Sequence, residues 1–250
     1  MKKWLPVLVL ALLFGVGTMG VQAQQQVPIL LYHNLASSYE NPLLHITREQ
    51  FAQHMAALRQ AGYQSITYAE LIEAGASGGG TLPVHPIIIT FDDGYRSVYT
   101  DAFPILQEQG LCATVFVITG RMGAKAGDFP HFSWEEAREM EQSGVVDIES
   151  HSHTHPDFSV LSQEDTRLEA GLSKFLIESH LHKCCKVFAY PFGTESPYAQ
   201  ELQAAGYQAV NLVGDDGSNQ ISEGTMHLKR LTVCGDQPAQ QVLDMIQQAG

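Results

Sequence analysis

Residues 87–95 read Ile-Ile-Ile-Thr-Phe-Asp-Asp-Gly-Tyr and carry the clearest signal in the chain. The apolar run predicts a buried strand, and Gly94 predicts a turn directly after it. Side chains alternate in direction at a strand end, so one of the carboxylates Asp92 and Asp93 can bind a metal while the other handles a proton. The alternative is a strand end capped by two solvated acids.

A second apolar segment, residues 145–148, runs into a histidine-rich stretch that begins at His151 and ends at His155. On a helical turn, histidines four residues apart project from one face and can share one ion. With Asp93 as a third ligand, a fourth position stays open for water. Such a stretch is also compatible with a polar loop, but the Asp-Asp strand end in the same chain favours a metal site.

These two stretches resemble the first and second motifs of the polysaccharide deacetylases, also called NodB-homology or carbohydrate esterase family 4 domains. The resemblance implies a hydrolase that removes N-acetyl groups from an acetylated amino-sugar polysaccharide. It also implies that Asp92 is the general base. Asp93, His151 and His155 would then hold a divalent metal, usually Zn²⁺, with Co²⁺ and Ni²⁺ as other candidates.

Residues 188–193, Phe-Ala-Tyr-Pro-Phe-Gly, resemble the third motif of the family. The resemblance implies that the backbone N–H of Phe192 binds the oxyanion, with Pro191 and Tyr190 beside the substrate. Many members carry an arginine where Ala189 stands, and that arginine orients the catalytic aspartate. Arg230, in a late apolar segment, is the candidate replacement, and a surface arginine is the alternative.

The family's usual catalytic acid, a histidine in a late Leu-x-His motif, has no counterpart in the C-terminal third of the chain. Residues 28–35 instead form an apolar stretch with His33, which resembles the Tyr-His segment of a circularly permuted subgroup that includes poly-N-acetylglucosamine deacetylases. The resemblance makes His33 the general acid, and a strand-end histidine without a role is the alternative. Most other histidines are expected at the surface: His45, His54, His85, His131, His153, His180, His182 and His227.

Helical and strand patterns alternate along the chain. Helices are expected at residues 47–62, 98–109, 133–144 and 163–182 and from residue 196, and further strands at 113–118 and 207–213 and from residue 228. A flexible loop is expected at residues 74–81. With motif residues at the C-terminal ends of strands, this order predicts an α/β barrel, and the resemblance implies the distorted (β/α)7 barrel of NodB-homology type. A doubly wound sheet is the alternative.

Residues 1–23 have the charged start, apolar stretch and small-residue end of a signal peptide, which leaves residues 24–250 as one deacetylase domain. We therefore expect export to a periplasm or beyond, with no membrane span after cleavage. A formal net charge of −13 argues against nucleic acid as a partner. Four cysteines without C-x-x-C spacing are compatible with a disulfide, for example from Cys184 or Cys185 to Cys234.

Two other functions fit the same residues. The absence of an arginine at position 189 and the displaced acid are compatible with a carbohydrate-binding relative that lacks turnover, although Asp92 would then have little purpose. A hydrolase of O-acetyl esters would use nearly the same chemistry.

Overall fold

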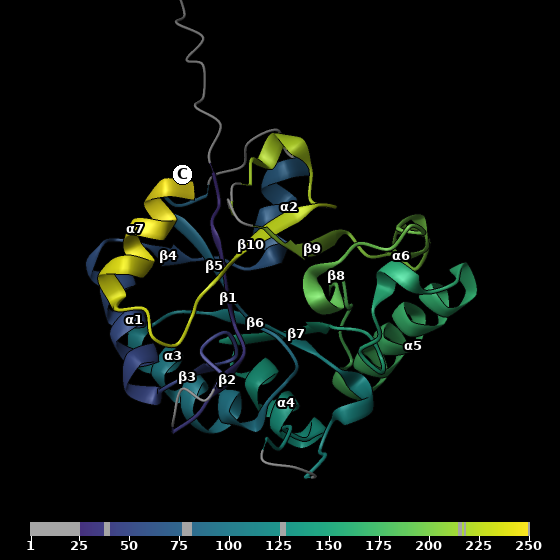
Figure 1. Ribbon diagram of the computed structural model, residues 1–250, viewed down its shortest axis with the longest axis horizontal. Helices are drawn as coiled ribbons and strands as arrows, with labels where there is room; N and C mark the ends of the chain where they lie inside the picture. The colour runs from purple at the N-terminus through teal and green to yellow at the C-terminus, as the bar shows by residue number, and fades with distance from the viewer. Residues whose placement is uncertain are drawn as a thin grey trace, which may run out of the picture.

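Seven parallel strands form a closed barrel in the computed structural model, which describes residues 26–37, 41–76, 82–125, 129–214, 217 and 219–249 (Figure 1). The predicted signal peptide lies outside the described residues. The first strand pairs with both the second and the last barrel strand, and this closes the barrel. In chain order the barrel strands are β1 (Ile29–Tyr32), β5 (Pro86–Phe91), β6 (Ala113–Val117), β7 (Val146–Ser150), β8 (Val187–Ala189), β9 (Ala209–Val213) and β10 (Leu228–Thr232).

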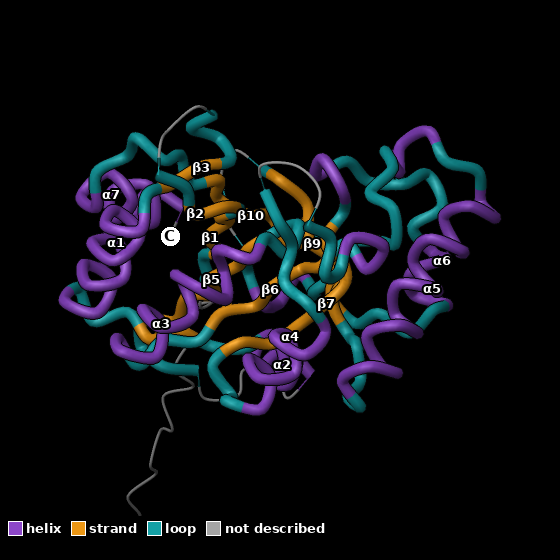
Figure 2. The backbone as a smooth tube through the Cα atoms, turned by 90° about the horizontal axis from the view of Figure 1, so that it is seen from below, coloured by secondary structure: helices purple, strands orange, loops and turns teal. Residues whose placement is uncertain are grey.

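Helices surround the strands, with α1, α3 and α7 towards one end of the molecule and α5 and α6 towards the other (Figure 2). Their bounds are α1 (Arg48–Gln60), α2 (Tyr68–Ala76), α3 (Phe103–Gln109), α4 (Trp134–Gln142), α5 (Gln163–Leu181), α6 (Gln200–Ala204) and α7 (Ala239–Ala249). The predicted (β/α)7 barrel is therefore confirmed, and the doubly wound sheet is wrong. None of the helices in the described ranges is long and apolar enough to cross a membrane.

In the described part of the chain, one short strand adds to the barrel sheet and two others form a separate small sheet. The strand β4 (Gln64–Ser65) pairs with β5 outside the closed ring. The strands β2 (Asn34–Leu35) and β3 (His45–Ile46) pair with each other directly after β1. All six residues of β5 are buried, because a parallel strand in a closed barrel is covered on both faces.

The predicted helix starts follow capping chemistry. The Thr47 side chain accepts a hydrogen bond from the Gln50 backbone at the start of α1. Ser133 and Glu136 form a complete capping box at the start of α4. The helix expected from residue 196 begins only at Gln200, because the Ser196 hydroxyl accepts a hydrogen bond from the Tyr198 backbone and holds a turn there.

Three further expectations are corrected. Residues 74–76 of the expected loop belong to α2, and residues 77–81 lie outside the described ranges. The histidines His45, His54 and His131 are buried, at 7%, 1% and 8% exposure. The His54 ring is held inside by contacts with the Tyr32 hydroxyl and the Gln237 carbonyl. All four cysteines are free, so the suggested disulfide is absent.

Candidate active site

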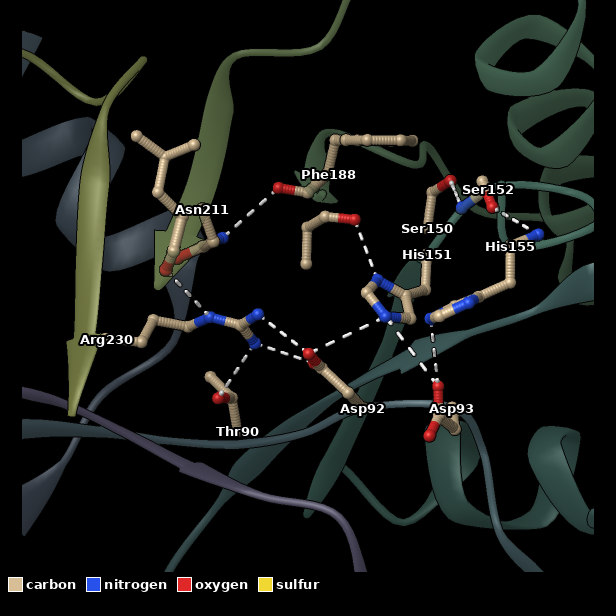
Figure 3. A network of polar contacts seen from close by, with 12 residues as sticks. Thr90, Asp92, Asp93, Ser150, His151, Ser152, His155, Phe188, Asn211 and Arg230 are labelled. Carbon is tan, nitrogen blue, oxygen red and sulfur yellow. Dashed lines mark hydrogen bonds and ion pairs between the residues drawn. The ribbon is translucent and has the colours of Figure 1, made fainter. Parts of the chain in front are cut away.

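The first two motifs meet at the C-terminal face of the barrel. Asp93 follows β5, and His151 follows β7, so parallel strands bring both to the same face. The Asp93 Oδ1 atom lies 3.5 Å from His155 Nε2 and 3.7 Å from His151 Nε2 (Figure 3). Ligands of a tetrahedral ion with bonds of about 2.0–2.1 Å lie roughly 3.3–3.4 Å apart, so these three residues fit a divalent ion such as zinc.

The two histidines lie on a loop, and the expectation of a helical turn is wrong. Ser152 and His155 have φ angles of 71° and 67°, in the left-handed region, which breaks any helix there. The Ser152 hydroxyl accepts a hydrogen bond from the His155 backbone at 2.9 Å and holds the turn. Asp93, at φ 73°, shares this strained conformation. Backbone strain of this kind clusters at functional sites, because only a tightly determined surrounding maintains it.

The Nε2 atom of each imidazole faces Asp93. His151 Nδ1 lies 2.7 Å from the Ala189 carbonyl oxygen, which can only accept, so Nδ1 carries a proton and Nε2 is the atom placed to bind a metal. Burial lowers the pKa of His155 to about 4. The His155 ring is therefore neutral near pH 7, with a lone pair available to a metal.

Glu169 on α5 fixes the loop between the two histidines, and the sequence analysis missed it. One carboxylate oxygen accepts hydrogen bonds from the backbones of His153 and Thr154 at 2.9 and 2.8 Å. The other accepts the Thr154 hydroxyl at 2.7 Å. The His153 ring contacts Thr119 instead of the candidate metal site. A glutamate on a helix surface carries no motif, so only the fold reveals this role.

Asp92 forms a buried, two-pronged ion pair with Arg230. The two guanidinium nitrogens lie 2.6 and 2.7 Å from the two carboxylate oxygens (Figure 3). Arg230 lies on β10 and is 0% exposed, which rules out the surface alternative. Its guanidinium lies 5.4 Å from the centre of the Phe116 ring. The chain therefore supplies an arginine to Asp92 from a different strand than Ala189 on β8.

The electrostatics of Asp92 follow from this pair. Burial by itself would raise the pKa of Asp92, but the charge and hydrogen bonds of Arg230 lower it to about 2. Asp92 is therefore an ionised carboxylate at neutral pH although it is only 3% exposed. Its Oδ2 atom lies 3.7 Å from His151 Nε2, so the ionised carboxylate lies next to the candidate metal site.

His33 lies beside Asp92. Tyr32 pairs with Phe91 across β1 and β5, and the Asp92 N–H donates to the Tyr32 carbonyl at 3.0 Å, so the next residue on each strand lies side by side. The buried Nδ1 atom of His33 has no hydrogen-bond partner among the residues that the structure describes. Burial lowers the pKa of His33, and the carboxylates of Asp92 and Asp93 oppose that shift.

The third motif forms a strained loop next to His155. Phe192 has a φ of 59°, its side chain is 68% exposed, and its ring centre lies 4.7 Å from that of His155. A Cβ on Gly193 would lie 2.5 Å from the Cβ of Val213, so only glycine allows this close approach. Tyr190 and Pro191 are buried beneath the loop. Their contact with a substrate stays a prediction.

Comparison with known proteins matches this chain to polysaccharide deacetylases. The sequence model described as polysaccharide deacetylase matches residues 79–210. The Bacillus subtilis protein YxkH, named as an inferred polysaccharide deacetylase, is 33% identical over 216 residues, which cover 83% of this chain and 71% of that protein.

One further relative has a name that states its substrate, and another has a solved structure. The poly-beta-1,6-N-acetyl-D-glucosamine N-deacetylase of Escherichia coli K12 is 29% identical over 200 residues, which cover 64% of this chain and 29% of that enzyme. The solved structure of IcaB from Ammonifex degensii superposes with a TM-score of 0.78 at 28% identity and covers 89% of this chain and 97% of that one.

Proposed function

Because the chain belongs to the polysaccharide deacetylase family, we propose that it removes N-acetyl groups from an exported polysaccharide that contains N-acetylglucosamine. The observation that carries the proposal is the ionised carboxylate of Asp92. Arg230 holds it next to the three candidate metal ligands, and it is not one of them. An ionised carboxylate 3.7 Å from a candidate metal ligand is placed to accept a proton from a metal-bound water, which a binding protein does not require. Similarity to the E. coli enzyme favours a β-1,6-linked polymer.

Asp93, His151 and His155 would hold the metal, and we propose Zn²⁺. Two imidazole nitrogens and one carboxylate oxygen are a ligand set that zinc binds in catalytic sites. The bound ion would polarise the acetyl carbonyl and lower the pKa of a water molecule. The hydrogen bond from His151 to the Ala189 carbonyl supports this role, because ligand histidines usually donate their second N–H to a fixed acceptor.

Asp92 is the proposed general base. It would take a proton from the attacking water, and Arg230 keeps both carboxylate oxygens in place without itself giving up a proton. The backbone N–H of Phe192 would stabilise the negative oxygen that forms when water adds to the carbonyl. Collapse of that species breaks the carbon–nitrogen bond and releases acetate.

His33 is the proposed general acid. The departing nitrogen must be protonated, because an amide anion is a poor leaving group. His33 follows β1 and Asp92 follows the neighbouring strand β5. The proposed proton donor and proton acceptor therefore lie side by side at the candidate metal site. Within the described part of the chain, its Nδ1 atom has no hydrogen-bond partner.

The test measures acetate release from β-1,6- and β-1,4-linked N-acetylglucosamine oligomers, with zinc and with chelator. We expect metal-dependent release that falls roughly 100- to 10,000-fold in Asp92→Asn and in His33→Ala. Full activity in His33→Ala would remove His33 from the mechanism. No release from any oligomer by the metal-loaded protein would overturn the deacetylase function, and release from O-acetyl sugars alone would favour the esterase.

A further inference from the structure

The outer face of α5 is apolar. Leu168, Leu172 and Phe175 are 55%, 42% and 64% exposed, and their spacing of four and three residues places them on one stripe of the helix. The opposite face already packs on the barrel through the buried residues Thr166, Ala170, Ser173 and Ile177. Figure 2 shows α5 at one end of the molecule. Isolated apolar residues on a surface are ordinary, but a contiguous stripe of three marks an interaction surface.

Gly171 forms a gap in the middle of this stripe. It lies three residues after Leu168 and four before Phe175, so it adjoins both on the helix surface. A Cβ built on Gly171 would meet nothing within 4 Å, so the packing of the chain itself does not require glycine there. Glycine is also the least favourable residue after proline inside a helix. A glycine at such a position allows the close approach of another surface.

The charges along one edge of the stripe are of opposite sign. Arg167 is exposed and forms no ion pair with any residue in the described ranges. Glu178 lies eleven residues later on the same edge of α5, where its Oε1 atom pairs with Lys174 at 3.1 Å and its side chain is 36% exposed. Two copies of α5 in antiparallel orientation would bring Arg167 of each copy near Glu178 of the other.

We propose that α5 is the contact surface of a homodimer. Two copies pack α5 antiparallel about a two-fold axis near Leu172, and Phe175 of each copy fills the gap over the partner's Gly171. The protruding ring, the gap, the cation and the anion all lie on one helix face, so this face is complementary to itself, as a two-fold dimer requires. The formal net charge of −13 disfavours an anionic membrane as the occupant.

The dimer is expected to be weak. A stable interface buries about 800 Å² per partner, and three side chains on one helix supply less. We expect a dissociation constant on the order of 10–100 µM, which places the transition within reach of sedimentation equilibrium. The mature protein should therefore change from monomer to dimer across about 1–500 µM.

Phe175→Glu should leave only monomer across this range, while acetate release is unchanged, because Phe175 lies outside the catalytic face. Leu43→Glu is the matched control, since Leu43 is also apolar and 57% exposed but lies far from α5 in the chain. A wild-type monomer at every concentration would overturn the proposal, as would a dimer that persists in Phe175→Glu. Activity is a separate readout, so the proposed function can fail while the dimer stands.

Gly171→Ala should have opposite effects on folding and association. Alanine is the better helix former, so the thermal midpoint of the monomer should rise by about 2–4 °C. Its methyl group occupies the gap, so dimer affinity should fall at least about tenfold. An unchanged or stronger dimer would overturn the proposed packing of Phe175 on the partner's Gly171.

Cross-linking tests the antiparallel arrangement in a Cys184→Ser background, which removes the exposed native thiol. Leu172→Cys lies next to its own copy at the two-fold axis and should form a disulfide between copies. Ser179→Cys should not, because its two copies lie roughly 21 Å apart along the helix axis at 1.5 Å per residue. Equal cross-linking of both variants would indicate parallel helices and overturn the proposed arrangement.

Discussion

The candidate active site has two halves that are built differently. The metal half, Asp93 with His151 and His155, lies on strained loops between strands, and Glu169 holds the loop between the two histidines through the His153 backbone. The proton half, Asp92 with Arg230, is a buried ion pair between two strands of the barrel. Changes in the first half should therefore cost metal and activity with little stability, whereas changes in the second should cost both activity and stability.

The largest effect is expected from the metal half. His155→Ala removes one of three ligands, so the variant should lose its bound metal and at least about 1,000-fold in acetate release. The thermal midpoint of the metal-free protein should change little. His153→Ala, on the same loop but with its ring on Thr119, is the control and should keep its metal. Metal content by elemental analysis decides whether the ligand assignment stands.

Asp92→Asn tests whether the proton half is separate from the metal half. We expect roughly a 100- to 10,000-fold loss in kcat with one metal still bound per chain, because the base is removed but the ligands remain. Loss of metal together with activity would mean that Asp92 is also a metal ligand. The distance of 3.7 Å between Asp92 Oδ2 and His151 Nε2 is the reason for this test.

Arg230→Met tests the stability of the buried pair. It leaves the Asp92 carboxylate buried without a partner, so the free energy of unfolding should fall by about 3–5 kcal/mol. Denaturant unfolding of the metal-free protein measures this. Arg48→Met, in an exposed 3.6 Å pair with Asp101, is the control and should cost less than about 1 kcal/mol. Equal losses would show that burial does not distinguish the two pairs.

Glu169→Gln should have an intermediate effect on the metal half alone. The amide keeps one oxygen for the backbones of His153 and Thr154 but loses the charge, so metal affinity should fall about 10-fold. Glu164→Gln, in the first turn of the same helix, is the control. A competition titration with a coloured chelator gives the affinity. Identical affinities in both variants would remove Glu169 from the supporting structure of the site.

The smallest effect is a pH dependence that belongs to the proton half. The folded pKa of Asp92, about 2, lies below its unfolded value of about 3.9, so its stabilisation is present above pH 4 and is lost as the pH falls towards 2. The difference in unfolding free energy between wild type and Asp92→Asn should therefore narrow from pH 5 to pH 3. A constant difference would contradict the low pKa.

The sequence predicted the parts of the site that are local in the chain. Asp92 and Asp93 at a strand end, and two histidines four residues apart, are visible as patterns, and the structure brings them together. The loop conformation of the histidines was not predictable, because the same spacing fits a helical turn. Glu169 was missed because its partners are backbone groups, which leave no mark in the side-chain pattern.

Long-range placement was harder to predict than chemistry. The sequence offered Arg230 as a candidate partner for Asp92, but only the strand order, with β1 between β5 and β10, shows that its side chain reaches the carboxylate. The burial of His45, His54 and His131 was likewise hidden, because each depends on elements distant in the chain, such as Gln237 for His54.

The Asp92–Arg230 pair can form only late in the synthesis of the chain. Asp92 leaves the ribosome 138 residues before Arg230, which lies on the last strand. Until that strand joins β1 and β9, the barrel is open and the carboxylate lacks its counter-charge. An incomplete chain therefore cannot bury the catalytic base at low cost, and the contacts that complete the site are among the most distant in sequence and so among the slowest to form. Completion of the fold and assembly of the proton half are then one event.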